Sequence, residues 1–570
     1  MRYSKLTQIN RSNVKKLKVA WTYHTGEKLD PGSTIECTPV VVDGVMYITT
    51  AKIHVVALDA ATGKRKWEYT PPKTGRVNRG VAYWTDGKAK RVLIGTVKGQ
   101  LISLDAKTGL PDPNFGDNGI ADTRIGLDRD VSAFDYDITS AVAVYKDLVV
   151  TSIVSSEGQP GAPGDVRAFD VRTGKEVWAF HTVPRPGEVG NDTWEGDSWR
   201  DRSGTNPWPG YTVDTKNGLL FCGVGSATSD FYGADRGGAN LFANCTLALD
   251  AATGQRRWHF QTVHHDLWDH DNPCPPVLCT ITRNGKKLDV AVQPTKTGFL
   301  YVFDRLTGKP VYDVKEVPAP ASSVPGEKAW PTQPEPIKPP RLEPAGITAD
   351  DLTNVTPEKA AYVRNWVKSL RLGRAYEPPS LEGTVVNPGY HGGATWSGAS
   401  VDPTTGILYI NTNNVPAVQK LVANGNGGYD FAGYTFFFDQ DGHPANKPPW
   451  SHLTAVDLGK GTFVWRKVFG EHPELKAKGI PPTGCQNFGG TIVTAGGLVF
   501  IGATQDEKFH AYDKATGKLL WQHKLPAGGY ATPCTYSVKG RQYVVIAAGG
   551  GGKLGTKSGD AFVAYALGAK

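Results

Sequence analysis

The sequence predicts an all-β fold: an eight-bladed β-propeller whose blades are four-stranded antiparallel sheets. A short motif recurs along the chain, Gly (67), Pro (40) and Trp (15) are abundant, and long amphipathic helical stretches are nearly absent. This composition suits many short strands joined by tight turns. A chain of 570 residues is long for one domain, but propellers grow by repetition around an axis.

The recurring motif is an aspartate, a glycine four residues later and often a tryptophan four residues after that. Apolar residues alternate before the aspartate and predict a strand. The aspartate begins a tight turn by accepting hydrogen bonds from backbone N–H groups, and the glycine supplies a positive φ. The tryptophan returns on a second strand and fills the layer between neighbouring sheets. The motif aspartates are Asp59, Asp105, Asp170, Asp250, Asp304, Asp457 and Asp513.

The spacing of the copies matches four-stranded blades with variable loops, except between Asp304 and Asp457. That stretch contains a diverged strand-turn-strand at residues 400–409. The clear copies together with this diverged unit predict eight blades, and we expect the two chain ends to close the ring.

We expect one domain over residues 1–570, with a Pro-rich and helical insertion at about 315–395 and a long loop at about 415–450. Within the insertion, Thr356 precedes Pro357. This pair predicts a helix with a threonine N-cap and proline at its first position. A propeller does not by itself indicate a function, because scaffolds, binding proteins and enzymes share the fold.

The formal net charge of +8 comes from scattered residues, with one short cluster at Lys15, Lys16 and Lys18. We interpret it as a solvated surface and expect no nucleic-acid partner, because phosphate binding needs clustered basic residues. No stretch is long and apolar enough to span a bilayer. No signal peptide is visible. We expect a periplasmic or secreted bacterial protein from which that peptide has been removed.

The seven cysteines are too few for a disulfide scaffold. Cys274 and Cys279 are close in sequence, and both a disulfide and two buried thiols remain open. No Cys-x-x-Cys-His motif occurs, so the sequence contains no site for covalent haem attachment.

The segment from Thr262 to Asn272 contains three carboxylates and three histidines within residues 264–271. Like charges held together destabilise a fold unless a cation or hydrogen bonds satisfy them. Asp269 and Asp271 alternate in a possible strand, so we expect both to face one hard cation such as Ca²⁺. A solvated polar loop is the alternative.

Two other features suit a flat ligand. Trp208 lies among small residues after Ser203 and offers an open face for stacking. Glycine runs at 489–490 and 549–552 leave room for close backbone approach. The second run has no following helix and no phosphate-loop pattern, so it does not indicate a nucleotide site.

Five further segments are long and specific: Thr262–Asp269, Lys296–Gly298, Trp330–Pro334, Pro526–Pro533 and Gly555–Asp560. Through these segments the chain resembles the quinoprotein dehydrogenases, which carry pyrroloquinoline quinone (PQQ) in the axis of an eight-bladed propeller. The resemblance covers nearly the whole chain. The resemblance is strongest to their membrane glucose dehydrogenase branch. It implies oxidation of a sugar (aldose) or alcohol hydroxyl by hydride transfer to PQQ.

The resemblance also implies a separate electron acceptor, a cytochrome or a quinone. A modestly positive surface helps an acceptor protein to dock.

Position by position, the resemblance implies roles for individual residues. Asp269 matches the catalytic base, and Lys296 matches a basic residue that binds and polarises the quinone carbonyl region. Asp506 matches a carboxylate paired with that lysine, and Trp208 matches the tryptophan that stacks on the quinone ring. The other residues expected to contact the cofactor are Glu36, Arg79, Thr139, Thr395, Asn487 and Phe488.

The metal ligands implied by the resemblance are Asp269, Asp271, Ser226 and Glu157. Ser226 stands where the methanol-oxidising branch has an asparagine, and the glutamate ligand has no unambiguous match, because Gln159 competes with Glu157. That branch also has two adjacent cysteines near the cofactor, which this sequence lacks near Arg79. Ca²⁺ is the first expectation. A lanthanide remains open because relatives that use one have a carboxylate at Asp271, and Mg²⁺ remains open as well.

Two rival hypotheses remain. One is a non-catalytic propeller scaffold of the outer-membrane assembly-factor type, and the other is an enzyme that has lost metal binding. The substrate also remains open. The aromatic residues of the long loop are either a wall of the substrate pocket or packing beneath the loop.

Overall fold

The computed structural model describes residues 2–75 and 77–568, and its sheets are built mainly from consecutive antiparallel strands. Four sheets precede residue 262. In chain order they are β3 (Val40–Val42), β4 (Val45–Thr49), β5 (Val55–Asp59) and β6 (Arg65–Tyr69); β7 (Ala82–Thr85), β8 (Lys90–Gly95), β9 (Gln100–Asp105) and β10 (Ile120–Asp122); β12 (Ala143–Tyr145), β13 (Leu148–Thr151), β15 (Val166–Asp170) and β16 (Glu176–Phe180); β17 (Tyr211–Asp214), β18 (Leu219–Gly223), β19 (Cys245–Asp250) and β20 (Arg256–Gln261).

The second half of the chain continues the series. Its sheets are β21 (Val277–Arg283), β22 (Lys286–Pro294) and β23 (Leu300–Asp304); β28 (Ser400–Asp402), β29 (Ile407–Asn413), β34 (Ser451–Asp457) and β35 (Thr462–Val468); β36 (Ile492–Thr494), β37 (Leu498–Ile501), β38 (Lys508–Asp513) and β39 (Leu519–Lys524), with β1 (Tyr3–Ser4) added parallel to β36; and β40 (Cys534–Val538), β41 (Arg541–Gly550) and β42 (Ser558–Leu567), completed by β2 (Leu17–His24). The prediction of an all-β protein with four-stranded antiparallel sheets is confirmed.

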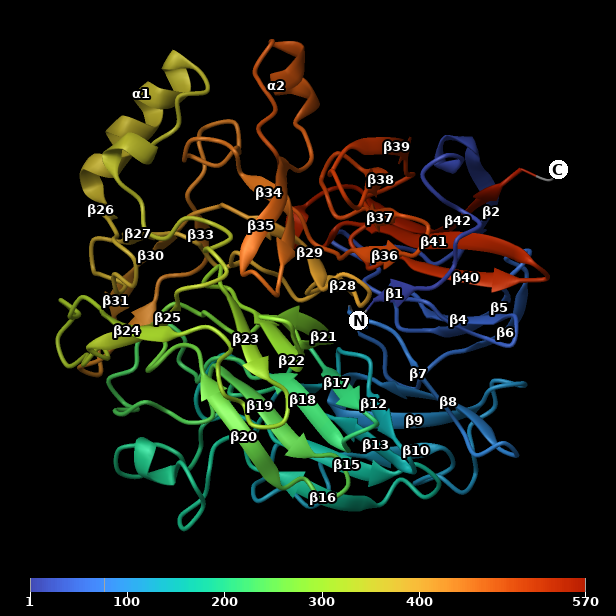
Figure 1. Ribbon diagram of the computed structural model, residues 1–570. Coiled ribbons are helices and arrows are strands. Elements are labelled where there is room, and N and C mark those ends of the chain that lie inside the picture. The colour runs from blue at the N-terminus through green and yellow to red at the C-terminus, as the bar shows by residue number, and fades with distance from the viewer. Residues whose placement is uncertain (1, 76, 569–570) are drawn as a thin grey trace.

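The two ends of the chain close a ring. Strand β2 pairs antiparallel with β42, with Leu17 opposite Leu567. Figure 1 shows the red strands β40–β42 beside the blue strand β2. Hydrophobic clusters join each sheet to the next one in the chain, and one of them joins the first sheet to the last through Ile48 of β4 and Val545 of β41.

The recurring motif joins many of the sheets to their neighbours. The Asp513 carboxylate accepts hydrogen bonds from the backbone N–H groups of the turn that follows it, and Gly517 has a φ of 68°. The Trp465 indole of the preceding sheet donates to Lys514 O at 3.0 Å and covers Gly517. Tryptophans lie in the same way on the glycine of the following sheet at Trp67–Gly109, Trp178–Gly254 and Trp258–Gly308.

The insertion forms an extension beside the ring. The predicted helix is confirmed as α1 (Pro357–Trp366), whose N-cap Thr356 accepts a hydrogen bond from Lys359 N. The remaining elements outside the main sheets are the hairpin β24 (Val314–Pro318) and β25 (Thr332–Pro336); the sheet β26 (Arg371–Leu372), β27 (Thr384–Val386), β30 (Ala417–Gln419) and β33 (Thr435–Phe436); the pair β31 (Leu421–Ala423) and β32 (Tyr429–Phe431); the pair β11 (Tyr136–Asp137) and β14 (Val154–Ser155); and α2 (Pro473–Ala477).

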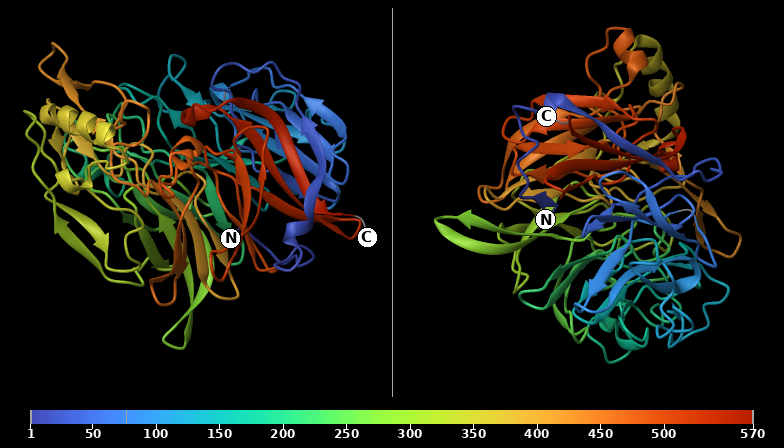
Figure 2. Two further views of the ribbon diagram at one scale, coloured as in Figure 1. Left: turned by 90° about the horizontal axis from the view of Figure 1, so that it is seen from above. Right: turned by 90° about the vertical axis from the view of Figure 1, so that its right-hand side faces the viewer.

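A buried ion pair holds α1 against the long loop. The Lys359 ammonium lies 2.7 Å from Asp439 Oδ2 and 2.7 Å from Asp441 Oδ2. His443, next to this pair, bonds Glu474 of α2 at 2.8 Å. These contacts explain why α1 and α2 stand together beyond the sheets in Figures 1 and 2.

The structure also settles the cysteine alternatives. Cys274 and Cys279 are buried free thiols rather than a disulfide. Over residues 2–75 and 77–568, no helix has both the length and the apolar character needed to cross a membrane.

Gly517→Ala should destabilise the protein more than Gly540→Ala does. Both glycines have a positive φ (68° and 72°), which costs alanine about 1–2 kcal/mol. A Cβ at Gly517 would lie 2.7 Å from the Trp465 ring, whereas a Cβ at Gly540 would meet nothing within 4 Å. We expect Gly517→Ala to cost about 1–3 kcal/mol beyond this backbone term, through overpacking. Urea denaturation measures both variants, and equal losses would contradict the account of the motif.

Candidate functional site

The segments that precede the first strand of successive sheets touch one another at the centre of the ring. Thr38 N donates to Arg79 O at 3.2 Å, and Arg79 N donates to Thr139 O at 2.9 Å. Ser140 Oγ donates to Trp208 O at 2.5 Å. These segments lead into β3, β7, β12 and β17, so cofactor residues expected from four separate sheets are brought side by side.

A second set of site residues follows the second strand of a sheet. Ser226 comes after β18, Lys296 after β22 and Asp506 after β37. Because antiparallel strands alternate in direction, the end of a second strand lies at the same end of the sheet as the start of the first. Both sets of loops therefore meet at one end of the ring.

Lys296 ties the two carboxylates of the Asp-rich segment together. Its Nζ lies 2.8 Å from Asp269 Oδ1, 2.9 Å from Asp269 O and 2.9 Å from Asp271 Oδ2. All three side chains are largely buried. Asp269 has a φ of 58°, a left-handed backbone that aspartate adopts more readily than most residues. The structure thus places Asp269, Asp271 and Lys296 in direct contact.

The charge states of this cluster differ between the two aspartates. Burial raises the pKa of Asp269 well above its usual range, with Asp271 and Glu157 adding to the rise and Lys296 opposing it. Burial also disfavours the charge on Asp271, but Lys296 and the Ser226 N–H outweigh it and lower the pKa of Asp271. One ammonium does not compensate two buried carboxylates, so the arrangement suits an additional cation.

Trp208 joins this cluster to a group of aromatic side chains. Its Nε1 donates to Asp271 Oδ2 at 3.3 Å, and its ring packs with Trp396, Phe488 and Tyr530. The Arg79 guanidinium lies 5.3 Å from the Trp208 ring centroid and 4.8 Å from that of Trp396. A flat apolar face therefore lies directly beside the carboxylates.

The Arg79 guanidinium keeps one buried N–H donor without a hydrogen-bond partner in the described chain. It pairs with Glu36 at 3.0 Å and donates to Thr139 Oγ1 at 3.1 Å, so three residues that we expect to contact the cofactor lie side by side. Its Nε is buried and has no hydrogen-bond partner in the described chain. A buried guanidinium N–H without a partner fits a ligand carboxylate, so these residues fit an acidic cofactor such as PQQ.

Asp266 organises the loop through hydrogen bonds to its side-chain oxygens. Its oxygens accept hydrogen bonds from Trp268 N (3.0 Å), His270 N (2.7 Å), Asn244 Nδ2 (3.0 Å) and the Ser226 hydroxyl. Burial lowers the pKa of His270 to about 4, so this histidine is neutral near pH 7. The segment is therefore not a solvated polar loop.

Two of the expected cofactor residues have contacts that differ from the expectation. Asp506 does not pair with Lys296 in the described residues; it accepts hydrogen bonds from Thr504 Oγ1 (2.6 Å) and Lys508 N (3.1 Å), because Asp269 and Asp271 already hold the ammonium. The expected ion pair is wrong for this structure. Asn487 donates both amide hydrogens, to Thr412 O and Asn413 Oδ1, and so holds its own loop in place.

Thr395 lies on a loop that packs directly on Lys296. Gly393 N donates to Lys296 O at 2.7 Å, and a Cβ at Gly392 would overlap the lysine side chain. Thr395 Oγ1 bonds Ser397 Oγ at 3.1 Å. The glycines therefore let this loop approach and fix the lysine.

The long loop reaches the site through Tyr434. Its hydroxyl donates to Glu157 Oε2 at 2.6 Å, and its ring lies 4.8 Å from that of Tyr390. Burial raises the pKa of Tyr434, and the carboxylates of Asp269 and Glu157 add to that rise. The aromatic residues of the loop therefore pack together, and Tyr434 also binds the carboxylate of Glu157.

Asp230 was not singled out from the sequence. Burial raises its pKa well above the usual range, and the carboxylates of Asp269, Glu157 and Asp271 add to that rise. Its position four residues after Ser226 was the available signal, but sequence alone gives no sign that this aspartate is buried.

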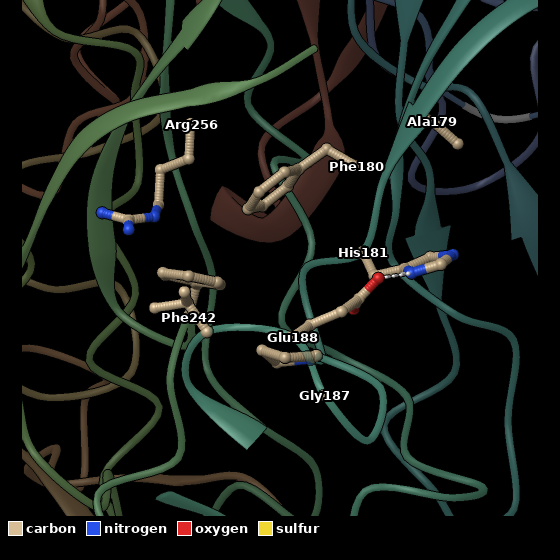
Figure 3. A pocket seen from close by; sticks show the side chains of 9 residues that line it. Ala179, Phe180, His181, Gly187, Glu188, Phe242 and Arg256 are labelled. Carbon is tan, nitrogen blue, oxygen red and sulfur yellow. Dashed lines mark hydrogen bonds and ion pairs between the residues drawn. The ribbon is translucent and has the colours of Figure 1, made fainter. Parts of the chain in front are cut away.

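A surface pocket elsewhere does not belong to this site. It has a volume of about 430 Å³, lies between β16 and β20, and is lined by Phe180, His181, Glu188, Phe242 and Arg256 among others (Figure 3). His181 and Glu188 pair at 2.9 Å there. None of the candidate cofactor or metal residues lines it.

Residues 1–544 match the family described as PQQ glucose/ethanol/alcohol dehydrogenase, beta-propeller domain. The chain therefore belongs to this family of quinoprotein dehydrogenases. It is 35% identical over 629 residues to the quinoprotein glucose dehydrogenase of Escherichia coli (strain K12), covering 99% of this chain and 77% of that protein. It is 35% identical over 630 residues to the glycerol dehydrogenase large subunit of Gluconobacter oxydans (strain 621H), covering 100% and 84%.

Solved structures of similar proteins have a similar fold. The quinohemoprotein alcohol dehydrogenase from Comamonas testosteroni superposes with a TM-score of 0.74 at 28% identity, covering 100% of this chain and 79% of that one. A europium-containing methanol dehydrogenase gives a TM-score of 0.74 at 26% identity, covering 99% and 96%.

Lys296→Met should destabilise the metal-free protein by about 3–5 kcal/mol, because it leaves two buried carboxylates without their ammonium partner. Urea denaturation in the presence of a chelator measures this loss. Lys64→Met, at an exposed turn position, is the control and should change stability by less than about 0.5 kcal/mol. A loss in Lys296→Met no larger than in the control would show that the ammonium does not hold the cluster together.

Proposed function

We propose that this protein is a PQQ-dependent dehydrogenase that oxidises a sugar, with an aldose as first choice, or an alcohol. The observation that carries the proposal is the contact of Lys296 with Asp269 and Asp271 beside the Trp208 face. A scaffold needs no such group, because buried carboxylates in excess of their cations destabilise a fold that does not use them.

The residues that would hold the cofactor are distributed around the centre of the ring. Trp208 offers the stacking face, and Arg79 with Glu36 and Thr139 offers polar contacts for acidic groups. Asp269 and Asp271 are the oxygen ligands that suit Ca²⁺, with a lanthanide or Mg²⁺ as alternatives. When bound, PQQ accepts the hydride and the cation acts as a Lewis acid.

In this proposal Asp269 is the general base. Its carboxylate takes the proton of the substrate hydroxyl while the carbon-bound hydrogen leaves as hydride. Lys296 orients this carboxylate through Oδ1 and the backbone carbonyl and supplies positive charge beside it. Burial and the charge of the same carboxylate raise the pKa values of Tyr434 and Tyr390, whose rings lie 4.8 Å apart. Such aromatic faces suit the apolar face of a sugar or alcohol.

We further propose that the successive sheets are the eight blades of one propeller domain, with the three-stranded sheet β21–β23 as one of them. The meander order of each sheet and the closure by β2 support this count. The electrons pass to a separate cytochrome or quinone acceptor, in the periplasm or outside the cell.

Asp269→Asn should lower turnover by about 10²–10⁴-fold, because the amide does not accept the substrate proton. The purified protein is loaded with PQQ and Ca²⁺, and dye reduction is followed with glucose, other aldoses, alcohols and polyols. PQQ retention, measured from its absorbance after gel filtration, should remain near the wild-type level. Asp30→Asn, at an exposed position, is the control for both readouts.

Each rival makes a different prediction in the same assay. A scaffold retains no PQQ and reduces no dye, and an enzyme that has lost its metal site retains PQQ without turnover. Near-normal turnover by Asp269→Asn with PQQ and metal present would remove Asp269 from the mechanism.

A further inference from the structure

Three side chains that can bind a metal lie together outside the candidate cofactor site: His443, His472 and Glu474. One ligand atom of each lies within 4.8 Å of the other two. His443 Nε2 is 2.8 Å from Glu474 Oε1, and His472 Nδ1 is 3.3 Å from the same oxygen. Ligand atoms around a tetrahedral Zn²⁺ ion are about 3.3 Å apart, because the metal–ligand bonds are about 2.0–2.1 Å long. The three groups therefore have nearly the spacing that a zinc ion requires.

The two histidines come from different segments and are held against one buried tryptophan. His443 lies in the long loop before β34, and His472 directly precedes α2, between β35 and β36. The Trp450 ring centroid is 5.8 Å from that of His443 and 5.5 Å from that of His472, and Trp450 is fully buried. The two imidazole rings are therefore positioned by packing before any metal binds.

The two ring nitrogens of His443 face different groups. On the Nδ1 side, Asp439, Asp441 and His443 also form a possible ligand set, but the Lys359 ammonium occupies it at 2.7, 2.7 and 3.1 Å. On the Nε2 side, the Glu474 carboxylate pairs only with the two histidines in the described part of the chain, and with no lysine or arginine. The Nε2 side is therefore the one that suits an added cation.

His472 has a buried ring nitrogen without a partner. Its Nε2 is shielded from solvent and makes no hydrogen bond within the described residues. Burial lowers the pKa of His472, and His443 adds to that effect, so the ring is mostly neutral near pH 7. A neutral imidazole keeps one lone pair, which is the form that binds a metal.

The charges around His443 also favour a divalent cation. Asp439, Asp441 and Glu474 carry three negative charges against the single positive charge of Lys359, so a divalent ion would balance the remaining two. Metal binding at Nε2 leaves the ring proton on Nδ1, 3.7 Å from Asp439 Oδ1. Histidines that bind a metal commonly donate their other N–H to a carboxylate in this way. Glu474 is exposed, so water can reach the ion.

We propose that His443, His472 and Glu474 bind a Zn²⁺ ion, with water as the fourth ligand. Two imidazoles and one carboxylate suit Zn²⁺, whereas Ca²⁺ takes oxygen ligands. The ion joins the long loop, which carries Tyr434, to the segment at α2, and so stabilises the extension beside the ring. The proposal goes beyond the proposed function, because none of the three ligands is a candidate cofactor residue.

The test is a Zn²⁺ titration of the purified protein in competition with a chromophoric chelator. Excess Ca²⁺ is present to occupy sites built from oxygen ligands. His472→Gln and Glu474→Gln should each weaken Zn²⁺ binding by at least about tenfold, because even residues that only orient a metal ligand contribute that much. His24→Gln, at an exposed histidine paired with an aspartate, and Asp441→Asn, in the neighbouring group, are controls and should bind like wild type.

Two outcomes of this titration would overturn the proposal. If wild type binds Zn²⁺ no more tightly than Glu474→Gln, any binding is adventitious and the histidines form only an ion pair with Glu474. If Asp441→Asn loses Zn²⁺ binding while Glu474→Gln keeps it, the metal belongs to the group that contains Asp439 and Asp441.

Thermal denaturation provides a second readout that does not depend on a chelator. Zn²⁺ should raise the melting temperature of wild type and of both controls, because a ligand of the native state stabilises it. The rise should be absent from His472→Gln and Glu474→Gln, whose melting temperatures without Zn²⁺ show whether they fold. An equal rise in wild type and in these two variants would contradict the proposal. Neither measurement uses PQQ or dye reduction, so the result is independent of the proposed function.

Discussion

The packing of a tryptophan on the glycine turn of the following sheet is the interaction on which the ring depends. It fixes both the spacing and the angle between neighbours, because the indole N–H has one carbonyl to reach and the glycine leaves room for one ring, as at Trp465 and Gly517. This contact recurs at many of the interfaces, other apolar side chains such as Phe115 and Tyr312 take the place of the tryptophan at Gly174 and Gly461, and the pairing of β2 with β42 closes the ring. A closed ring leaves each sheet little freedom to shift.

The rigidity of the ring matters at its centre, where the candidate site lies. Arg79, Trp208, Lys296 and Asp269 come from four different stretches of chain. Arg79 precedes β7 and Trp208 precedes β17, whereas Asp269 precedes β21 and Lys296 follows β22 of the same sheet. In a flexible loop, carboxylates that outnumber the neighbouring ammonium would repel one another and move apart. Here the Asp266 carboxylate fixes the loop by accepting hydrogen bonds from its backbone N–H groups, and the closed ring supplies stability. The protein can therefore keep a destabilising group of charges at a place that suits a cofactor and a cation.

Much of this was predictable, for identifiable reasons. Strand, turn and tryptophan positions follow from local patterns, and the helix at Pro357 follows from its cap, because these depend on neighbours in sequence. That Asp269 and Lys296 belong to one site was expected only through the resemblance to the family, and their direct contact was not predicted. Two features were not predicted: Asp506 does not form the ion pair assigned to it, and Glu157 is exposed. Each depends on how loops from different sheets approach one another, which no local pattern encodes.

The most direct measurement of the central claim is anomalous diffraction from crystals grown with PQQ and Tb³⁺. The account predicts an anomalous peak beside Asp269 and Asp271, with the PQQ ring stacked on Trp208. A crystal with no peak among these carboxylates, or with PQQ bound away from Trp208, would contradict it.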